Sequence, residues 1–268
     1  LPELTSRHRV VLELSELQLP TLSRGTDTAV YTHVTSDHLD RHGTLTAYRQ
    51  VKRRLVELLP ASGTLVRNED DPVVSSYRAP AGARTLTYTR SAPAADGVGV
   101  RDGWVVAGEE LAPAGHDGRL LPLEAIPLPG EHNVSTVPAA VAVGLIHGIG
   151  PAAIAAAVRE FAGVEHRLER VAEIAGVTYV NDSQGTQPDA VIAAGRAFGQ
   201  PLVLIAGGRS KGVPVDALAA AVAERVTAAV LIGETAEELA EAFSAAGLAR
   251  IERAASMETA VEAATVIA

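Results

Sequence analysis

Polar residues that could bind a metal or move a proton gather at one place, directly after an apolar run. The segment 30–42 reads VYTHVTSDHLDRH and contains His33, Asp37, His38, Asp40 and His42. Imidazole and carboxylate groups are ligands for Mg²⁺, Mn²⁺ or Zn²⁺. The same groups also cap helices and hydrogen-bond loops, so the segment alone leaves both interpretations open. No cysteine and no H-E-x-x-H pattern occurs, which makes a zinc hydrolase a weak interpretation.

Two further segments contain charged residues that could contact a ligand. Glu13 lies in VLELSELQL, and burying a carboxylate in an apolar strand is costly unless it has a partner. It therefore lies either at a solvated edge or facing a cation. GVEHRLERV (163–171) carries His166 and Arg167, and the planar guanidinium suits a phosphate. A solvated linker charge is the simpler interpretation of that segment on its own.

The second half of the chain has polar groups after two apolar runs. In VNDSQGTQPDA (180–190), Asn181, Asp182 and Ser183 follow a strand-like run, and Thr186 to Asp189 fits a capping box that opens a helix. A helix start rich in hydroxyls attracts anions. IAGGRSKG (205–212) places bare amides beside two cations but lacks the G-x-x-x-x-G-K-[ST] spacing of a phosphate loop. It could bind a carboxylate as readily.

The elements that position these groups follow from hydrophobic periodicity. Strands are predicted at 10–14, 29–34 and 64–67, and an amphipathic helix with Thr44 as its N-cap carries Lys52. Short strands with Gly/Pro punctuation and an RDGW hairpin turn predict an antiparallel addition over 84–128. Helices are predicted from Asn133 and from Pro151.

Beyond Gly163 the pattern alternates strictly between strands and helices. Strands at 176–182, 201–208 and 228–234 each precede a helix, at 189–199, 215–226 and 236–247. Such alternation with near-continuous apolar strands predicts a parallel, doubly wound sheet. The fold class is therefore α/β, with a domain boundary near 163–166 that gives domains 1–163 and 164–268.

Composition narrows the function classes. The 268 residues carry a formal net charge of −9, which disfavours nucleic acid as a partner because counterion release needs a basic surface. No run approaches a membrane span, and LPELTSRHRVV is not a signal peptide, so a cytoplasmic protein without a membrane partner is expected. The absence of cysteine excludes disulfides and thiolate chemistry.

Six segments in a fixed order resemble the Mur ligases, across nearly the whole chain. They are VLELSELQL, VTSDHLDRHGTLTAYRQVK, LPGEHNVSTVPAA, GVEHRLERV, YVNDSQGTQPDA and LIAGGRSKG. Within the family the resemblance is greatest to the branch that adds D-glutamate to UDP-N-acetylmuramoyl-L-alanine. It implies a monomeric enzyme that uses ATP and Mg²⁺ and forms an acyl phosphate in peptidoglycan precursor synthesis. It also implies part of a central P-loop-type ATPase domain followed by a Rossmann-like C-terminal domain.

The resemblance implies a metal side and a nucleotide side of one site. On the metal side, Glu13 and His38 would hold Mg²⁺, and Lys52 matches a lysine that is carbamylated in the family. CO₂ on a neutral amine converts a cation into a long carboxylate that can serve a metal. An ordinary exposed helix lysine is the alternative for Lys52.

On the nucleotide side, Asn133, Arg167 and Asp182 match residues that meet ATP. Thr186 and Lys211 match positions that hold the incoming D-glutamate, whose carboxylates suit a cation.

The sequence also departs from the family pattern. His33 stands where an asparagine is usual, Glu16-Leu17 where Ser-Phe is usual, Thr136 replaces a second nucleotide-side asparagine, and Gln184 replaces a lysine. No segment matches the family's phosphate loop, its UDP-binding N-terminal domain or the end of its C-terminal domain. The sequence as written is therefore expected not to turn over by itself. Alternatives are another Mur or folylpolyglutamate-type ligase with a different acceptor, or a non-catalytic, ligase-derived nucleotide-binding or interaction module.

Overall fold

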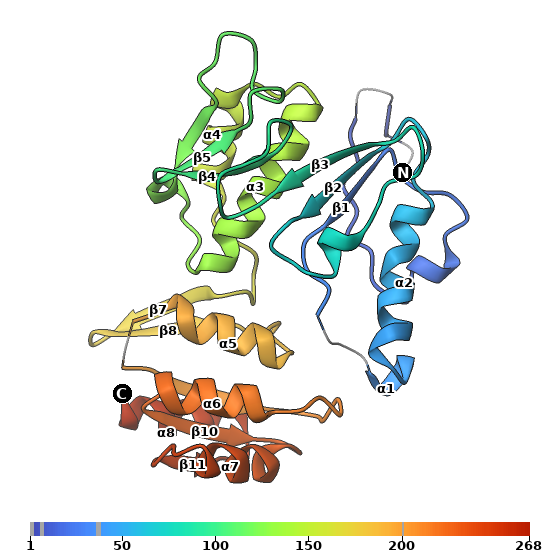
Figure 1. The fold of residues 1–268 in the computed structure, drawn as a ribbon. Coiled ribbons are helices and arrows are strands. Elements are labelled where there is room, and N and C mark those ends of the chain that lie inside the picture. Colours follow the sequence, from blue (N-terminus) through green and yellow to red (C-terminus); the bar gives the residue numbers. More distant parts are fainter. Residues whose placement is uncertain (1–2, 6–7, 36–38, 200) are drawn as a thin grey trace.

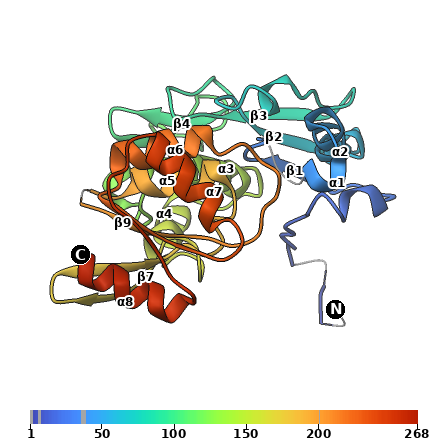
Figure 2. The same cartoon turned by 90° about the horizontal axis from the view of Figure 1, so that it is seen from below.

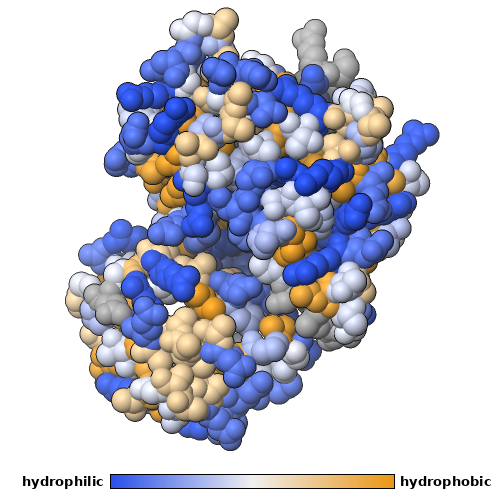
Figure 3. Space-filling view, in the orientation of Figure 1, coloured by the Kyte–Doolittle hydropathy of each residue, from blue (hydrophilic) through white to orange (hydrophobic). Residues whose placement is uncertain are grey.

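The computed structural model describes residues 3–5, 8–35, 39–199 and 201–268. The chain folds into an upper part, which contains β1 to β6, and a lower part, which contains β7 to β11 (Figure 1). The two parts meet where the first turn of α3 approaches α5, and a recess surrounded mainly by hydrophilic residues separates them on the face shown in Figure 3.

The upper part is built on a six-stranded mixed sheet with its strands in sequence order. The first four strands run parallel to one another, and β5 runs in the opposite direction, so that it pairs antiparallel with both β4 and β6. The strands are β1 (Thr28–Tyr31), β2 (Thr64–Asn68), β3 (Arg84–Tyr88), β4 (Val98–Arg101), β5 (Trp104–Ala107) and β6 (Arg119–Pro122).

Helices cover both faces of this sheet and bury two apolar cores. α2 (Leu45–Glu57) packs Tyr48 and Val56 against one face, where Ala29 and Leu65 are fully buried. α3 (Glu131–Ile146) and α4 (Pro151–Glu160) cover the other face and its antiparallel end. The short helical segments are α1 (Leu39–His42), η1 (Leu19–Thr21), η2 (Val74–Ser76) and η3 (Leu123–Ala125).

Two local predictions in the upper part are confirmed. The Thr44 side chain accepts a hydrogen bond from the Ala47 amide at 3.1 Å and starts α2. Asp102 and Gly103 join β4 to β5 with φ values of 52° and 76°, the positive pair that a tight type I′ turn requires. These features depend on neighbouring residues alone, which is why the sequence indicates them well.

Two other predictions in the upper part are wrong. Residues 10–14 form no strand, and Val11 is 90% exposed. An apolar run becomes a strand only where another strand pairs with it, and among the described residues the sheet ends at β1. The segment 84–88, predicted as part of the antiparallel addition, is β3 and pairs parallel with β2.

The lower part contains a three-stranded parallel sheet, of which the alternating pattern predicts the strands at 201–208 and 228–234 but not the third. Its order is β11 (Ile251–Arg253), β10 (Ala228–Ile232) and β9 (Val203–Gly207). Ala229 and Leu231 face α6 (Asp216–Arg225) and α7 (Ala236–Ala245), whereas Val230 faces α8 (Met257–Ile267) on the opposite side. Helices on both faces make this a doubly wound arrangement.

The strand predicted at 176–182 lies outside that parallel sheet. It is β8 (Val177–Asn181), which pairs antiparallel with β7 (Glu169–Ile174) in a separate two-stranded hairpin. The Tyr179 hydroxyl donates to Thr265 Oγ1 of α8 at 3.0 Å, and Figure 2 shows the hairpin beside α8. α5 (Pro188–Ala197) follows β8 and packs against α6. The strand β7 is not among the predicted strands, because the charged residues of its segment favour a solvated linker.

Candidate functional site

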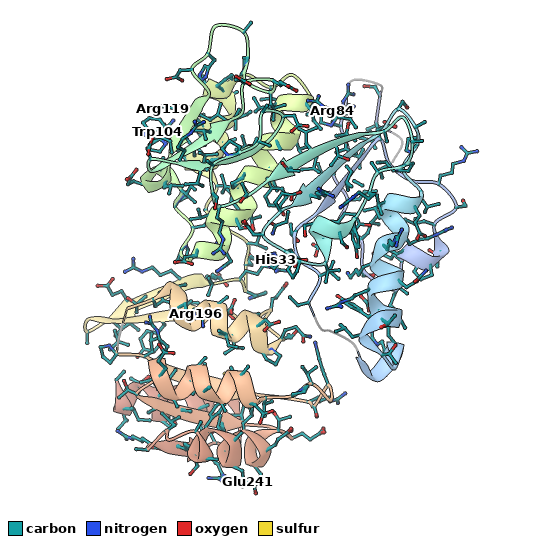
Figure 4. All side chains as sticks on the ribbon, viewed as in Figure 1. His33, Arg84, Trp104, Arg119, Arg196 and Glu241 are labelled. Carbon is teal, nitrogen blue, oxygen red and sulfur yellow. The ribbon has the colours of Figure 1, made fainter. Side chains whose placement is uncertain are left out.

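His33, which follows β1, lies beside the buried side-chain amide of Asn68 at the end of β2. Asn68 is fully buried, and its Nδ2 donates to the Thr32 carbonyl at 2.9 Å and lies 3.4 Å from His33 Nδ1. Its Oδ1 accepts from the Asp70 amide at 2.9 Å. His33 is exposed and lies on the side of the upper part that faces the lower part (Figure 4). The amide of Asn68 therefore orients the imidazole toward the junction.

A charged network links this strand end to the start of α3. Asp70 accepts from the Thr89 hydroxyl at 2.7 Å and from the Arg90 amide at 2.8 Å. The Arg90 guanidinium lies 3.3 Å from Glu131 Oε2 in the first turn of α3. β2, β3 and α3 are thus held together at the carboxyl ends of the strands, where open α/β sheets bind ligands.

The first turn of α3 contains Asn133, which is predicted to contact the nucleotide. Asn133 is half-buried, and its Nδ2 donates to the Pro129 carbonyl at 2.6 Å and lies 3.2 Å from His132 Nε2. Gly130 caps the helix with a φ of 92°, and a Cβ there would lie 2.7 Å from His132 Cε1 and 3.0 Å from Ala197 Cβ. A larger residue at 130 would therefore disturb the contact between α3 and α5.

His132 brings the two parts of the chain into electrostatic contact. Burial lowers the pKa of His132 below its usual value of 6.5, while Asp182 opposes that shift and His33 adds to it. His33 follows β1 and Asp182 follows β8, yet both lie close enough to His132 of α3 to influence its pKa. The predicted nucleotide residues Asn133 and Asp182 thus lie on opposite sides of one junction.

Asp182 and Arg167 are positioned together. Asp182 Oδ1 accepts a hydrogen bond from the Leu168 amide at 3.0 Å, directly after Arg167. Arg167 is exposed, and its amide donates to the Val164 carbonyl at 3.1 Å. The predicted nucleotide-side pair is therefore a structural unit formed by one turn and the end of β8.

Thr186 and Lys211, the two residues predicted to hold the acceptor, are in direct contact. The Lys211 ammonium donates to Thr186 Oγ1 at 3.0 Å and joins the loop after β8 to the loop after β9. The predicted capping role of Thr186 is wrong, since α5 begins at Pro188 after Gln187 and has no side-chain cap. The hydroxyl instead faces a cation, an arrangement that suits a carboxylate ligand.

The metal-side residues are less completely described. Lys52 is half-buried on α2, with its Nζ 5.7 Å from the centre of the Tyr48 ring. The Tyr31 hydroxyl, whose pKa is raised by burial, donates to the Lys52 carbonyl at 2.7 Å and fixes that turn of α2. Glu13 is exposed on the unpaired segment, and His38 lies outside the described residues.

The donor set expected for Mg²⁺ is incomplete in the part of the chain that the structure describes. Within that part, no group of three or more His, Cys, Asp or Glu residues could hold a metal ion. The metal role of Glu13, His38 and Lys52 therefore stays a prediction.

Sequence reasoning missed three residues of the site. Neither Asn68, which directly follows the predicted strand 64–67, nor His132, which directly precedes Asn133, is among the predicted site residues. Glu169 was assigned to a linker, although it accepts from the His166 amide at 2.9 Å. A polar run directly after a buried strand was the available signal for Asn68.

Among the described residues, no helix is long and apolar enough to cross a membrane.

Comparison with known proteins matches both halves of the chain. The model of the Mur ligase middle domain matches residues 4–144, and that of the Mur ligase glutamate ligase domain matches residues 166–268. UDP-N-acetylmuramoylalanine–D-glutamate ligase of Pelotomaculum thermopropionicum is 38% identical over 192 residues, which cover 71% of this chain and 41% of the relative. The ligase of the same name from Acidobacterium capsulatum is 41% identical over 191 residues, covering 70% and 41%. The chain thus spans about two fifths of the length of these relatives.

Solved structures share the fold at lower identity. MurF from Acinetobacter baumannii superposes with a TM-score of 0.67 at 16% identity, covering 90% of this chain and 53% of MurF. Folylpolyglutamate synthase from Mycobacterium tuberculosis, complexed with ADP and AMPPCP, gives a TM-score of 0.64 at 20% identity, covering 90% and 57%. Two consecutive family domains, matched in order on an α/β architecture of the same kind, establish that the chain belongs to the Mur ligase family.

Proposed function

We propose that the chain is the central and C-terminal part of an ATP-dependent ligase that adds D-glutamate to UDP-N-acetylmuramoyl-L-alanine. The observation that carries this proposal is the hydrogen bond between Lys211 and Thr186, which forms a cation–hydroxyl pair beside the junction. The names of the relatives support D-glutamate as the acceptor. Domains 1–163 and 164–268, a monomer and a cytoplasmic location belong to the same proposal.

The proposed reaction has two steps. The carboxylate of UDP-N-acetylmuramoyl-L-alanine attacks the γ-phosphorus of ATP, and ADP leaves as the acyl phosphate forms. The amine of D-glutamate then attacks the acyl carbon, phosphate leaves, and the amine loses a proton as the amide forms. Catalysis of such transfers depends on positioned charges and amides rather than on covalent chemistry by the protein.

The residues of this chain supply positioning on both sides of the junction. Asn133 on α3 and Asp182 with Arg167 in the lower part would hold the nucleotide between them. Lys211 and Thr186 would hold the carboxylates of D-glutamate and aim its amine at the acyl carbon. Lys52 belongs to the upper part and, if carbamylated, would help hold Mg²⁺ near the phosphates of ATP. ATP and Mg²⁺ are the expected substrate and cofactor.

The test is an acceptor comparison on the full-length protein. ADP release and product mass are measured with ATP and UDP-N-acetylmuramoyl-L-alanine, and D-glutamate, L-lysine or diaminopimelate is supplied in parallel. Of the three acceptors, only D-glutamate is expected to give product. Turnover with another acceptor would point to a sibling ligase, and failure to bind ATP would favour a non-catalytic module.

A further inference from the structure

The turn that carries Arg167 has an unfavourable backbone on both sides of the arginine. His166 has a φ of 66° and Leu168 a φ of 47°, and neither is glycine. Residues with a Cβ rarely adopt this left-handed conformation, because the Cβ approaches the following carbonyl oxygen. Such a backbone persists only where surrounding contacts hold it, and it is often found at functional sites.

Two carboxylates hold this turn through the amides of those same two residues. Glu169 Oε2 accepts from the His166 amide at 2.9 Å, and Asp182 Oδ1 accepts from the Leu168 amide at 3.0 Å. The His166 carbonyl in turn accepts from the Gln184 amide at 3.1 Å. Arg167 therefore lies between two backbone amides that are each held by a carboxylate.

Glu169 is fixed by the strand pairing of the hairpin. It lies opposite Asn181 in the register of β7 and β8, and Asn181 Nδ2 approaches Glu169 Oε2 at 3.3 Å and His166 Nδ1 at 2.9 Å. The Glu169 side chain is 35% exposed, so solvent does not fully replace these contacts. The carboxylate thus joins the hairpin to the turn.

The position of the Asp182 carboxylate requires glycine at 185. The Gly185 amide donates to the Asp182 carbonyl at 2.8 Å, and a Cβ at Gly185 would lie 2.4 Å from Asp182 Oδ2. The carboxylate occupies the space that any other residue would need. Asp182 is therefore committed to the turn through one oxygen, whatever its other oxygen meets.

We propose that Glu169 is a positioning residue that holds Arg167 toward the nucleotide, and that Asp182 completes this support from the other side of the turn. The inference rests on the proposed function, in which Arg167 meets ATP. Glu169 itself contacts the turn and not the substrate. Its removal is expected to act only through Arg167.

A set of variants of the full-length protein tests this dependence. Glu169→Ala is expected to raise KM for ATP about tenfold with a small effect on kcat, since one hydrogen bond to a charged group is lost. Glu169→Gln keeps a carbonyl oxygen for the His166 amide and is expected to restore most of the affinity. Glu173→Ala, on the same strand and paired with Arg170, is the matched control with wild-type kinetics.

The double variant Glu169→Ala with Arg167→Ala tests whether Glu169 acts through Arg167. If Glu169 acts through Arg167, the double variant has the same KM for ATP as Arg167→Ala alone. If the increases in KM for ATP of the two single variants multiply in the double variant, the proposal is overturned. Hydrogen exchange at the His166 amide is a readout independent of turnover, and it is expected to be faster in Glu169→Ala than in Glu173→Ala.

The failures of the two proposals are distinguishable. If Arg167→Ala leaves KM for ATP unchanged, the nucleotide role of Arg167 is wrong, whereas faster exchange at His166 in Glu169→Ala would still support the anchoring of the turn. Unchanged exchange at that amide would overturn the role of Glu169 whatever the kinetics.

Discussion

The ammonium of Lys211 donates a hydrogen bond to the hydroxyl of Thr186 at 3.0 Å, across 25 residues of sequence. The pair joins loops that follow β8 and β9, two strands that belong to different sheets. Under the proposed function, this cation and hydroxyl together would hold a carboxylate of the acceptor, which neither loop could do alone.

Lys211→Ala is therefore expected to raise KM for D-glutamate about tenfold or more, because a charge-assisted contact is lost. KM for ATP is expected to change little, and steady-state kinetics with each substrate varied in turn will show the difference. Arg250→Ala is the matched control, since Arg250 precedes β11, at the end of the sheet opposite to the Lys211 loop, and pairs with Glu252. An equal rise in both KM values for Lys211→Ala would contradict the acceptor role.

Lys52→Ala is expected to abolish turnover in the full-length protein if Lys52 acts as a carbamylated lysine. Formate or acetate at high concentration is then expected to restore part of the rate, because either supplies a free carboxylate to the vacated space. Arg53→Ala serves as the control, since Arg53 is exposed and pairs only with Glu57 on the next turn of α2 in the described contacts. Wild-type turnover in Lys52→Ala would rule out the metal-side role.

Gly207→Ala is expected to destabilise the lower part by about 3 kcal/mol or more. Gly207 has a φ of 139°, and a Cβ there would lie 1.9 Å from the Ile232 carbonyl oxygen on the neighbouring strand. Gly195→Ala in α5 is the matched control, because nothing lies within 4 Å and the helix gains about 1 kcal/mol from alanine. Urea unfolding of both variants measures the difference, and similar midpoints would contradict the close approach of β9 and β10.

Stability is expected to fall as the pH drops below about 6.5, in part through His132. Burial lowers the pKa of His132 in the folded state, so the unfolded chain binds more protons in the window between the two pKa values. The free energy of unfolding therefore rises with pH across that window and falls as the solution is acidified. In His132→Gln, the urea midpoint is expected to decline less steeply between pH 7.5 and 5.5. In the control His147→Gln, at an exposed position, the decline is expected to match that of the wild type.

The features that the sequence predicts well are those decided by a few neighbouring residues. Thr44 caps its helix and Asp102-Gly103 forms its turn because each needs only local backbone geometry. The errors arise where a distant partner decides. Residues 10–14 have the composition of a strand but pair with no strand in the described part of the chain, and Thr186 has the position of a cap but bonds to Lys211 instead.

The candidate site shows the same division. The family resemblance predicts site roles for Thr186, Lys211, Arg167 and Asp182. In the structure Lys211 bonds to Thr186, and Asp182 bonds to the Leu168 amide directly after Arg167. The resemblance could not identify Asn68, which lies 35 residues from the His33 ring that it orients. Contacts of that range depend on the order of the strands in the sheet, which hydrophobic periodicity does not reveal.

The separation of β8 from the parallel sheet has a thermodynamic consequence. In the described chain, the hairpin is tied to α8 by Tyr179 and Thr265 and to the β9 loop by Thr186 and Lys211, without a shared strand ladder. A ligand that requires both loops binds only molecules in which the hairpin is docked. The binding free energy of such a ligand therefore adds to the local stability of the hairpin, so that binding across the two loops and transient opening of β7–β8 are mutually exclusive states of one equilibrium.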